Sequence, residues 1–172
     1  IGAHITDVQT IFADLFEADD VARDGSVFDR LVTDGDELPL GNFAIKVLHT
    51  PGHTPACVTY IIGDAAFVGD TVFMPDYGTA RADFPGGDAR TLYRSIRKIL
   101  NLPKDTRLFT GHDYPPETRP TPAWEASVAD HRATNIHIHD GIDEAAFVAM
   151  REARDKTLAA PLLILPSRQV NI

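Results

Sequence analysis

The spacing of apolar residues along the chain changes between a helical and a strand-like period. Over residues 5–16, apolar side chains recur every three or four positions, which predicts an amphipathic helix. From Phe43 to Leu48, every second residue is a bulky apolar one (Phe43, Ile45 and Val47). This period of two ends at the turn residues Pro51-Gly52, so the segment is predicted to be a strand that ends in a turn. Alternation or short apolar runs predict four strands, at Phe43–Leu48, Ala56–Ile62, Ala65–Val68 and Arg107–Thr110.

The second half of the chain favours helices. The clearest is Ala89–Leu100, which Asp88 precedes as a helix N-cap and in which apolar residues share one face. Two more helices are predicted near Ala123–Arg132 and Glu144–Leu158. The glycine- and proline-rich stretch Met74–Gly87 is predicted to be irregular. Strand hairpins followed by helices indicate a mixed α/β protein built in layers.

Composition and charge narrow the class of protein. A length of 172 residues and an apolar fraction of 44% predict one domain, residues 1–172, with an ordinary globular core. The formal net charge of −9 argues against a nucleic-acid or anionic-membrane partner, because phosphate would be repelled. No apolar run approaches the roughly 20 residues needed to span a bilayer. The single cysteine, Cys57, cannot form an internal disulfide, which favours a reducing, cytoplasmic location.

Three potential metal ligands each follow a predicted strand and stand next to a glycine. His53 comes after the first of these strands, Asp70 after the third and His112 after the fourth. Residues at the ends of neighbouring strands converge in space, and imidazole with carboxylate is a ligand set of zinc and of non-haem iron. Each residue alone is more typical of an ordinary turn, so the prediction of a metal site rests on the three together.

Other chemically active residues near these motifs have two interpretations each. Arg81 and Asp83 flank one residue of an extended segment and would point the same way, as an ion pair that either orients a ligand or closes a loop. Tyr114 is either a phenol that hydrogen-bonds a bound substrate or a packing side chain. Cys57 is predicted to be a buried structural thiol rather than a nucleophile.

Taken together, the sequence motifs resemble those of a known superfamily. The late metal-site motifs of the metallo-β-lactamase fold superfamily are similar to Thr50-Pro51-Gly52-His53-Thr54, Gly69-Asp70-Thr71 and Gly111-His112-Asp113-Tyr114. The sequence also resembles the persulfide dioxygenase branch of the superfamily, a relative of glyoxalase II, in three further segments: Gly78-Thr79-Ala80-Arg81-Ala82-Asp83-Phe84, Leu92-Tyr93 and Leu102-Pro103. Bacterial members of this branch also resemble the chain at Pro166-Ser167 and Val170-Asn171-Ile172. The resemblance implies an αββα sandwich.

The superfamily's first metal-binding motif, H-x-H-x-D-H, is absent from the sequence. The one H-x-H is His137-Ile138-His139, which follows the other motifs and is interpreted as exposed polar residues of a strand or turn. The chain also opens on Ile1, with neither an initiator methionine nor a signal peptide. We therefore expect an N-terminally truncated αββα sandwich, whose incomplete ligand set would hold metal weakly.

The resemblance also implies an activity and roles for the site residues. In the persulfide dioxygenase pattern, Fe(II) is held by two histidines and one carboxylate, and His53 and Asp70 match two of these ligands. His112 would orient a bound water or ligand, while Tyr114 and Arg81 would act from further out, with Asp83 pairing with Arg81. The implied reaction is the oxidation of glutathione persulfide, or a similar small persulfide, to sulfite by O2, in a protein that is a homodimer in the family.

Two alternative hypotheses remain open from the sequence. In the glyoxalase II pattern, His53, Asp70 and His112 would all be ligands of a zinc pair, with Asp70 as the bridge, and the substrate would be a glutathione thioester. In the second alternative hypothesis, the chain is a non-catalytic remnant in which the late motifs have only a structural role. The identity of the bound metal separates the two enzymatic hypotheses.

Overall fold

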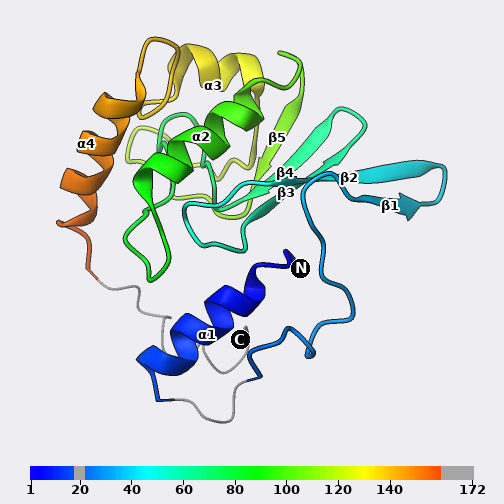
Figure 1. The fold of residues 1–172 in the computed structure, drawn as a ribbon. Coiled ribbons are helices and arrows are strands. Elements are labelled where there is room, and N and C mark those ends of the chain that lie inside the picture. Colours follow the sequence, from blue (N-terminus) through cyan, green and yellow to red (C-terminus); the bar gives the residue numbers. More distant parts are fainter. Residues whose placement is uncertain (18–21, 160–172) are drawn as a thin grey trace.

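A single mixed sheet forms the centre of the computed structural model, which describes residues 1–17 and 22–159 (Figure 1). Its strands are β1 (Glu37–Leu40), β2 (Phe43–His49), β3 (Val58–Ile62), β4 (Ala65–Gly69), β5 (Arg107–Thr110) and β6 (Glu125–Ser127). The helices within the described residues are α1 (Ile5–Leu15), α2 (Ala89–Leu100), α3 (Val128–Thr134) and α4 (Glu144–Asp155).

The strand order places three strand ends at one edge of the sheet. The strands lie side by side in chain order, and every neighbouring pair is antiparallel except β4 and β5, which are parallel. Strands β2, β4 and β5 therefore run in the same direction, with β3 opposite to them. Their carboxyl ends meet at one edge, which is where the predicted metal ligands were expected to converge.

One face of the sheet is covered by helices α2, α3 and α4 (Figure 1). Helix α2 begins after Asp88, whose carboxylate accepts a hydrogen bond from the Thr91 backbone N–H at 2.7 Å, as the sequence predicted for an N-cap. Its apolar stripe packs into a core made of Ala66, Val68, Leu92, Ile96, Ile99, Leu108, Val128 and Phe147, each at most 1% exposed. This core fixes α2 against the strands β4 and β5.

Truncation of Ile96, which is fully buried on α2, tests this packing. We expect Ile96→Ala to lower the free energy of unfolding by about 2–5 kcal/mol, because it removes buried methylenes and leaves a cavity. Urea denaturation would measure the change. Arg90→Ala, at an exposed position of the same helix, should cost under about 1 kcal/mol. Equal losses in the two variants would contradict the assignment of Ile96 to the core.

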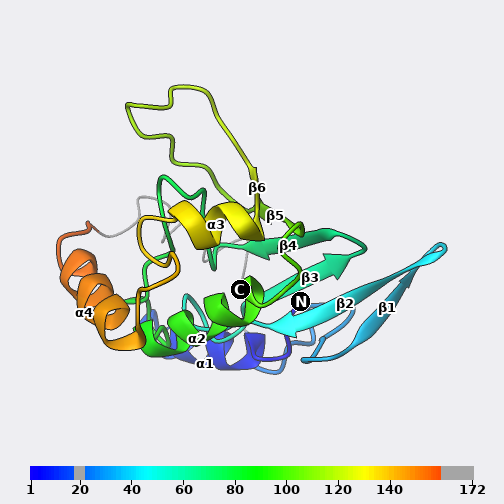
Figure 2. The same cartoon turned by 90° about the horizontal axis from the view of Figure 1, so that it is seen from above.

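The opposite face of the sheet is apolar and is exposed at some positions and covered at others: Val47 on this face is 2% exposed. Phe43 and Phe67 are 65% and 43% exposed, and Phe67 stacks on Phe109 with ring centroids 5.1 Å apart. The β1–β2 hairpin projects beyond the rest of the sheet (Figure 2). One sheet with a helix layer on one face is thus one βα half of the αββα arrangement that the resemblance implied. No helix in the described part of the chain is long and apolar enough to cross a membrane.

The structure corrects two interpretations made from the sequence. Residues 125–127, predicted as part of a helix over Ala123–Arg132, pair with β5 as strand β6, and α3 begins only after Ser127, whose capping box with Asp130 starts the helix. His137 is 8% exposed and Ile138 is fully buried, so the H-x-H segment is not exposed as predicted. The motifs at Pro166-Ser167 and Val170–Ile172 lie outside the described residues.

Candidate metal centre

Three loops bring His53, Asp70 and His112 together at the edge where β2, β4 and β5 end. The Nε2 atom of His53 lies 3.9 Å from Oδ2 of Asp70, and Nε2 of His112 lies 3.4 Å from the same oxygen. Two imidazoles from different loops thus face one carboxylate, although 59 residues separate the histidines in sequence. The side chain of His53 is the most buried of the three at 14% exposure, while His112 is 57% exposed.

The orientation of His53 is set by the loop that follows β4. Its Nδ1 atom lies 2.8 Å from the backbone carbonyl of Arg81. Because a carbonyl only accepts hydrogen bonds, Nδ1 carries a proton, and in the neutral ring the lone pair is then on Nε2, the atom that faces Asp70. The ring also packs against Phe84, with centroids 4.9 Å apart. His53 is therefore held in the tautomer that a metal ligand needs.

Glycines permit the close approaches that build this edge. Gly52, directly before His53, has a φ of 128° and lies so close to the backbone of Leu92 that a Cβ would collide with α2. At Gly111, a Cβ would lie 2.8 Å from Oδ1 of Asp70, so the absence of a side chain leaves room for that carboxylate. The glycines directly before His53 and His112 thus each have a steric reason.

The chemistry of these donors suits a metal ion, but they do not form a closed site. With bonds of about 2.0–2.2 Å, neighbouring ligand atoms on one zinc or iron ion lie about 2.8–3.6 Å apart. The 3.4 Å separation of His112 Nε2 from Asp70 Oδ2 falls within this range, and the 3.9 Å separation of His53 Nε2 from the same oxygen is longer. Within residues 1–17 and 22–159, no group of three His, Cys, Asp or Glu side chains is arranged to hold a metal by itself. The three residues fit part of a ligand set.

Tyr114 lies between this centre and a neighbouring pocket. Its ring stacks on Tyr77 at 4.9 Å, meets Phe73 edge-on at 5.4 Å and lies 5.9 Å from the ring of His112. Partial burial, with the negative charge of Asp70 nearby, raises the pKa of Tyr114, so the phenol keeps its proton at neutral pH. Tyr114 is therefore available as a hydrogen-bond donor beside His112.

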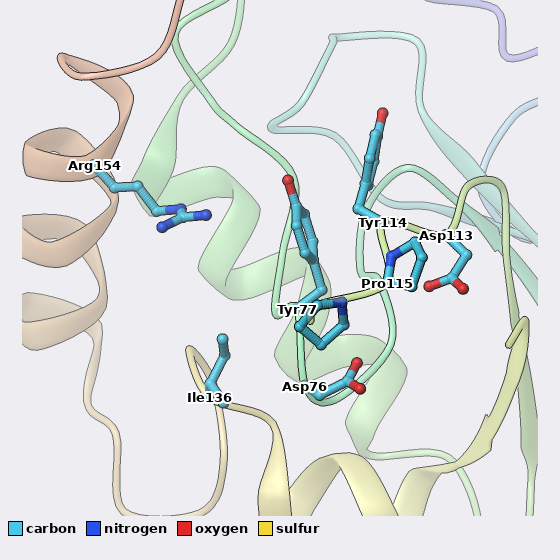
Figure 3. A pocket seen from close by; sticks show the side chains of 8 residues that line it. Asp76, Tyr77, Asp113, Tyr114, Pro115, Ile136 and Arg154 are labelled. Atoms are coloured by element: carbon cyan, nitrogen blue, oxygen red, sulfur yellow. The ribbon is translucent and has the colours of Figure 1, made fainter. Parts of the chain in front are cut away.

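The pocket next to Tyr114 has a volume of about 510 Å³. Figure 3 shows the rings of Tyr77 and Tyr114 side by side on one wall, while Arg154 reaches in from α4 on the other. The rest of the lining consists of Ile136, two prolines of the β5–β6 loop and two carboxylates: Pro115, Pro116, Asp76 and Asp113. This volume lies within the usual range for sites that bind small molecules.

Arg119 ties the loop that carries His112 and Tyr114 to Asp76, the residue before Tyr77. Its guanidinium donates two hydrogen bonds of 2.8 Å to the carboxylate of Asp113 and two more, at 2.6 and 3.1 Å, to Asp76. The hydrogen bonds from Arg119 hold the pKa of Asp113 below its ordinary value. The long loop between β5 and β6, which projects in Figure 2, is thereby anchored at the residue after His112.

Removal of Arg119 tests this anchor through pH. The lowered folded-state pKa of Asp113 means that the pair stabilises the fold above the unfolded pKa of about 4 and loses its effect as the pH falls through the folded value. In Arg119→Ala, we expect the pKa of Asp113 to rise, as measured by carboxyl NMR titration. The stability difference from the wild type, about 1 kcal/mol or less at pH 7, should shrink in acid.

A matched control for this prediction is Arg132→Ala, which removes an arginine paired with Asp140 on another part of the surface. It should leave the titration of Asp113 unchanged. The same Asp113 pKa in the wild type and in Arg119→Ala would show that the anchor does not act in solution.

Arg81 and Asp83 form the ion pair that the sequence suggested. The guanidinium donates to both carboxylate oxygens of Asp83, at 2.6 and 2.8 Å, and to the carbonyl of Ala159. Its hydrogen bonds hold the pKa of Asp83 below its usual range. The part of Arg81 that touches His53 is the backbone carbonyl, while its charged group also lies 5.2 Å over the ring of Phe84. The roles predicted for both side chains stay predictions.

Cys57 lies close to this loop. Its thiol is 3.1 Å from the hydroxyl of Thr54, and burial raises its pKa, so the sulfur stays protonated at neutral pH. Cys57 is partly rather than fully buried, and the structural role predicted for it stays a prediction.

A buried polar network behind the site had no counterpart in the sequence analysis. Arg151 and Asp155 of α4, 1% and 5% exposed, pair with each other, and His137 accepts a hydrogen bond at Nδ1 from the Thr79 backbone N–H at 3.0 Å. Burial, with positive charge from Arg151 and Arg154, lowers the pKa of His137 to about 4, so it stays neutral. An i, i+4 arginine–aspartate pair was visible in the sequence, but its burial was not.

The structure is an α/β domain whose six-stranded mixed sheet gathers imidazole and carboxylate side chains at its strand ends. The chain belongs to the Metallo-beta-lactamase superfamily, whose family model matches residues 4–112. The superfamily predicted from the sequence motifs is thereby confirmed.

Several relatives are similar over the whole chain or part of it. A probable metallo-hydrolase of Burkholderia pseudomallei is 57% identical over 100% of this chain and 62% of its own length. Glyoxylase B2 of Dictyostelium discoideum is 47% identical over 100% of this chain and 59% of its own length. The mitochondrial persulfide dioxygenase ETHE1 of Homo sapiens is 42% identical over 52% of this chain and 36% of its own length. The chain thus spans less than two thirds of each relative.

Among solved structures, the crystal structure of ETHE1 from Myxococcus xanthus resembles this fold with a TM-score of 0.72 and 31% sequence identity. The match covers 84% of this chain and 61% of that one. This likeness supports the branch of the superfamily that the motifs indicated.

Proposed function

We propose that this chain carries metal-binding and substrate-orienting residues of an iron-dependent persulfide dioxygenase. The observation that carries the proposal is the pair of His53, locked in the Nδ1–H tautomer, and Asp70, which faces its free Nε2 atom. The similarity to ETHE1 proteins in sequence and in structure supports it. A cytoplasmic homodimer belongs to the same proposal, in which the dimer rests on the family resemblance and the location rests on the single cysteine.

The proposed substrate is glutathione persulfide or a similar small persulfide. The terminal sulfur would be oxidised by O2, and one water would release the carrier, so that persulfide, O2 and H2O give thiol, sulfite and two protons. Fe(II), when bound, would supply adjacent open positions for sulfur and for dioxygen. His53 and Asp70 would hold this ion, as two ligands of a facial set of two histidines and one carboxylate.

The remaining residues of the site would orient the substrate. Tyr114 would donate a hydrogen bond from its protonated phenol to the reacting sulfur or oxygen, and His112 would orient a bound water from the other side of Asp70. The pocket beside Tyr114 is large enough for the body of a small thiol carrier. Fixed placement of the reacting groups removes the entropic cost of bringing them together.

A hydrolase of the glyoxalase II type is the second candidate. One observation favours it, because Oδ2 of Asp70 lies between the two histidines, as a carboxylate that bridges two metal ions would. The relatives named metallo-hydrolase and glyoxylase, which match the whole of this chain, also support it. In that case His112 would be a direct zinc ligand and the substrate a glutathione thioester.

Metal content and oxygen uptake separate the two candidates. We expect the full-length protein encoded by the gene, purified without added metal, to carry iron and to consume O2 with glutathione persulfide, as followed with an oxygen electrode. Stoichiometric zinc with thioesterase activity and no oxygen uptake would instead support the hydrolase.

In the same protein, we expect His53→Ala to lose its iron and its oxygen uptake, because a facial set loses one of its imidazoles. His139→Ala removes a histidine whose Nδ1 bonds only the nearby carbonyl of Asp140 in the described structure, and it should keep both. Normal iron in His53→Ala would contradict the ligand assignment.

Removal of the Tyr114 hydroxyl tests its role as a hydrogen-bond donor. We expect Tyr114→Phe to lower kcat/KM for the persulfide by about 10- to 100-fold, the effect of losing a hydrogen bond of about 1.5–3 kcal/mol to a charged group. Steady-state oxygen uptake would measure it. Tyr77→Phe makes the same change in the stacked neighbour and should have a much smaller effect. Equal losses would point to the aromatic wall rather than to the Tyr114 hydroxyl.

A further inference from the structure

The segment Thr79–Ala82 passes behind His53 and is held at both ends by side chains of α4. At one end, Nη1 of Arg151 donates to the carbonyl of Thr79 at 3.2 Å. At the other end, Oδ2 of Asp155 accepts the backbone N–H of Ala82 at 2.9 Å. The carbonyl of Arg81, which accepts the hydrogen bond from His53, lies between these two anchors.

The two anchoring side chains are buried and bonded to each other. Nε and Nη2 of Arg151 donate to Oδ1 of Asp155 at 2.9 and 2.6 Å, and the two residues are 1% and 5% exposed. Each group satisfies the other while its remaining polar atoms reach the Thr79–Ala82 backbone. A buried ion pair is weak evidence for stability on its own, and removing one partner leaves the other charge uncompensated. The hydrogen bonds from this pair to the backbone indicate that it fixes the position of the Thr79–Ala82 segment.

Two polar residues after α3 support the same segment from a third side. His137 accepts the backbone N–H of Thr79 at 3.0 Å, and the Asn135 side-chain amide donates to the carbonyl of Gly78 at 3.1 Å. The backbone from residue 78 to 82 is thus bonded by four buried side chains. The segment lies outside the named strands and has one isolated antiparallel bridge, between Thr79 and Val72, so these side chains rather than a strand pairing position the Arg81 carbonyl that faces His53.

We propose that Asp155, together with Arg151, is a positioning residue for His53. Through Ala82 and Thr79, the pair holds the Arg81 carbonyl at hydrogen-bonding distance from His53 Nδ1, and so keeps the Nε2 lone pair directed at Asp70. The inference rests on the part of the proposed function in which His53 binds the metal. It extends the site by two further layers of contacts, to a helix more than 90 residues away in sequence.

A purely structural pair would stabilise α4 against the loop without affecting the imidazole. The two roles differ in the tautomer of His53, which can be read in the metal-free, full-length protein by ¹H–¹⁵N NMR of the imidazole nitrogens. We expect the wild type to show the Nδ1–H form and Asp155→Ala to show a mixture of both tautomers. Phe147→Leu, which trims a buried apolar side chain of the same helix, should be destabilised and keep the Nδ1–H form.

Metal affinity gives a second readout that does not depend on turnover. With Co²⁺ as the probe, we expect the Kd of Asp155→Ala to rise about tenfold, comparable to the loss of a group that orients a ligand. Phe147→Leu should bind Co²⁺ like the wild type. In the His53→Ala background, adding Asp155→Ala should cause no further loss, because the positioned ligand is already absent.

A milder substitution keeps the proposal testable if Asp155→Ala fails to fold. Arg151→Lys retains a positive charge beside Asp155 but lacks the guanidinium arm that donates to Thr79. We expect a mixed tautomer and a rise in the Co²⁺ Kd of roughly two- to threefold, a partial form of the same loss. An unchanged His53 tautomer in the folded variants would overturn the proposal.

Equal effects of Asp155→Ala and Phe147→Leu on the tautomer and on the Kd would also overturn it, because they would reflect stability alone. The tautomer measurement stands apart from the enzymatic reaction. If the wild type consumes no oxygen but the His53 tautomer changes in Asp155→Ala as expected, the dioxygenase proposal is rejected and the positioning role stands.

Discussion

The hydrogen bond from His53 Nδ1 to the Arg81 carbonyl is the contact on which the candidate site depends. It assigns the tautomer, it leaves Nε2 free, and it joins the loop after β2 to the irregular segment after β4. Both partners need outside support, since neither lies in a helix or a strand. His53 receives it from the tight turn at Gly52 and from the ring of Phe84, and Arg81 receives it from the buried groups of α4. A single orienting bond is thus maintained by contacts from three distant parts of the chain.

The layers of the fold explain why this support is possible. Helices α2, α3 and α4 share one apolar core on one face of the sheet, and this core brings the end of α4 next to the loops at the sheet edge. The polar network of Arg151, Asp155 and His137 lies at the border of that core, where burial strengthens each hydrogen bond and makes each unpaired group costly. The other sheet face, with Phe43 and Phe67 exposed, contributes nothing to this support within the described residues.

Much of the fold could be predicted because its elements have strong local patterns. The helix Ala89–Leu100 has an N-cap and a continuous apolar stripe, and it was predicted with its observed bounds. Strand β6 was missed because its three residues, Glu125–Ser127, have no alternating pattern and are strand only through their pairing with β5. His137 was placed on the surface because the H-x-H segment was interpreted as exposed polar residues of a strand or turn. Its burial comes from the backbone of Thr79, which is 58 residues earlier in the chain.

The sequence by itself determined which residue types stand after β2, β4 and β5, and hence that imidazole and carboxylate groups would meet at one edge. It also indicated the superfamily, because its three short motifs at strand ends occur in the same order as the late metal-site motifs of that superfamily. Only the tertiary structure decided that Asp70 lies between the two histidines, that His53 presents Nε2, and that a backbone carbonyl rather than the Arg81 guanidinium orients it. The physical reason is that a tautomer and a buried ion pair depend on distances between segments far apart in the chain. Local patterns of hydrophobicity carry no information about such distances.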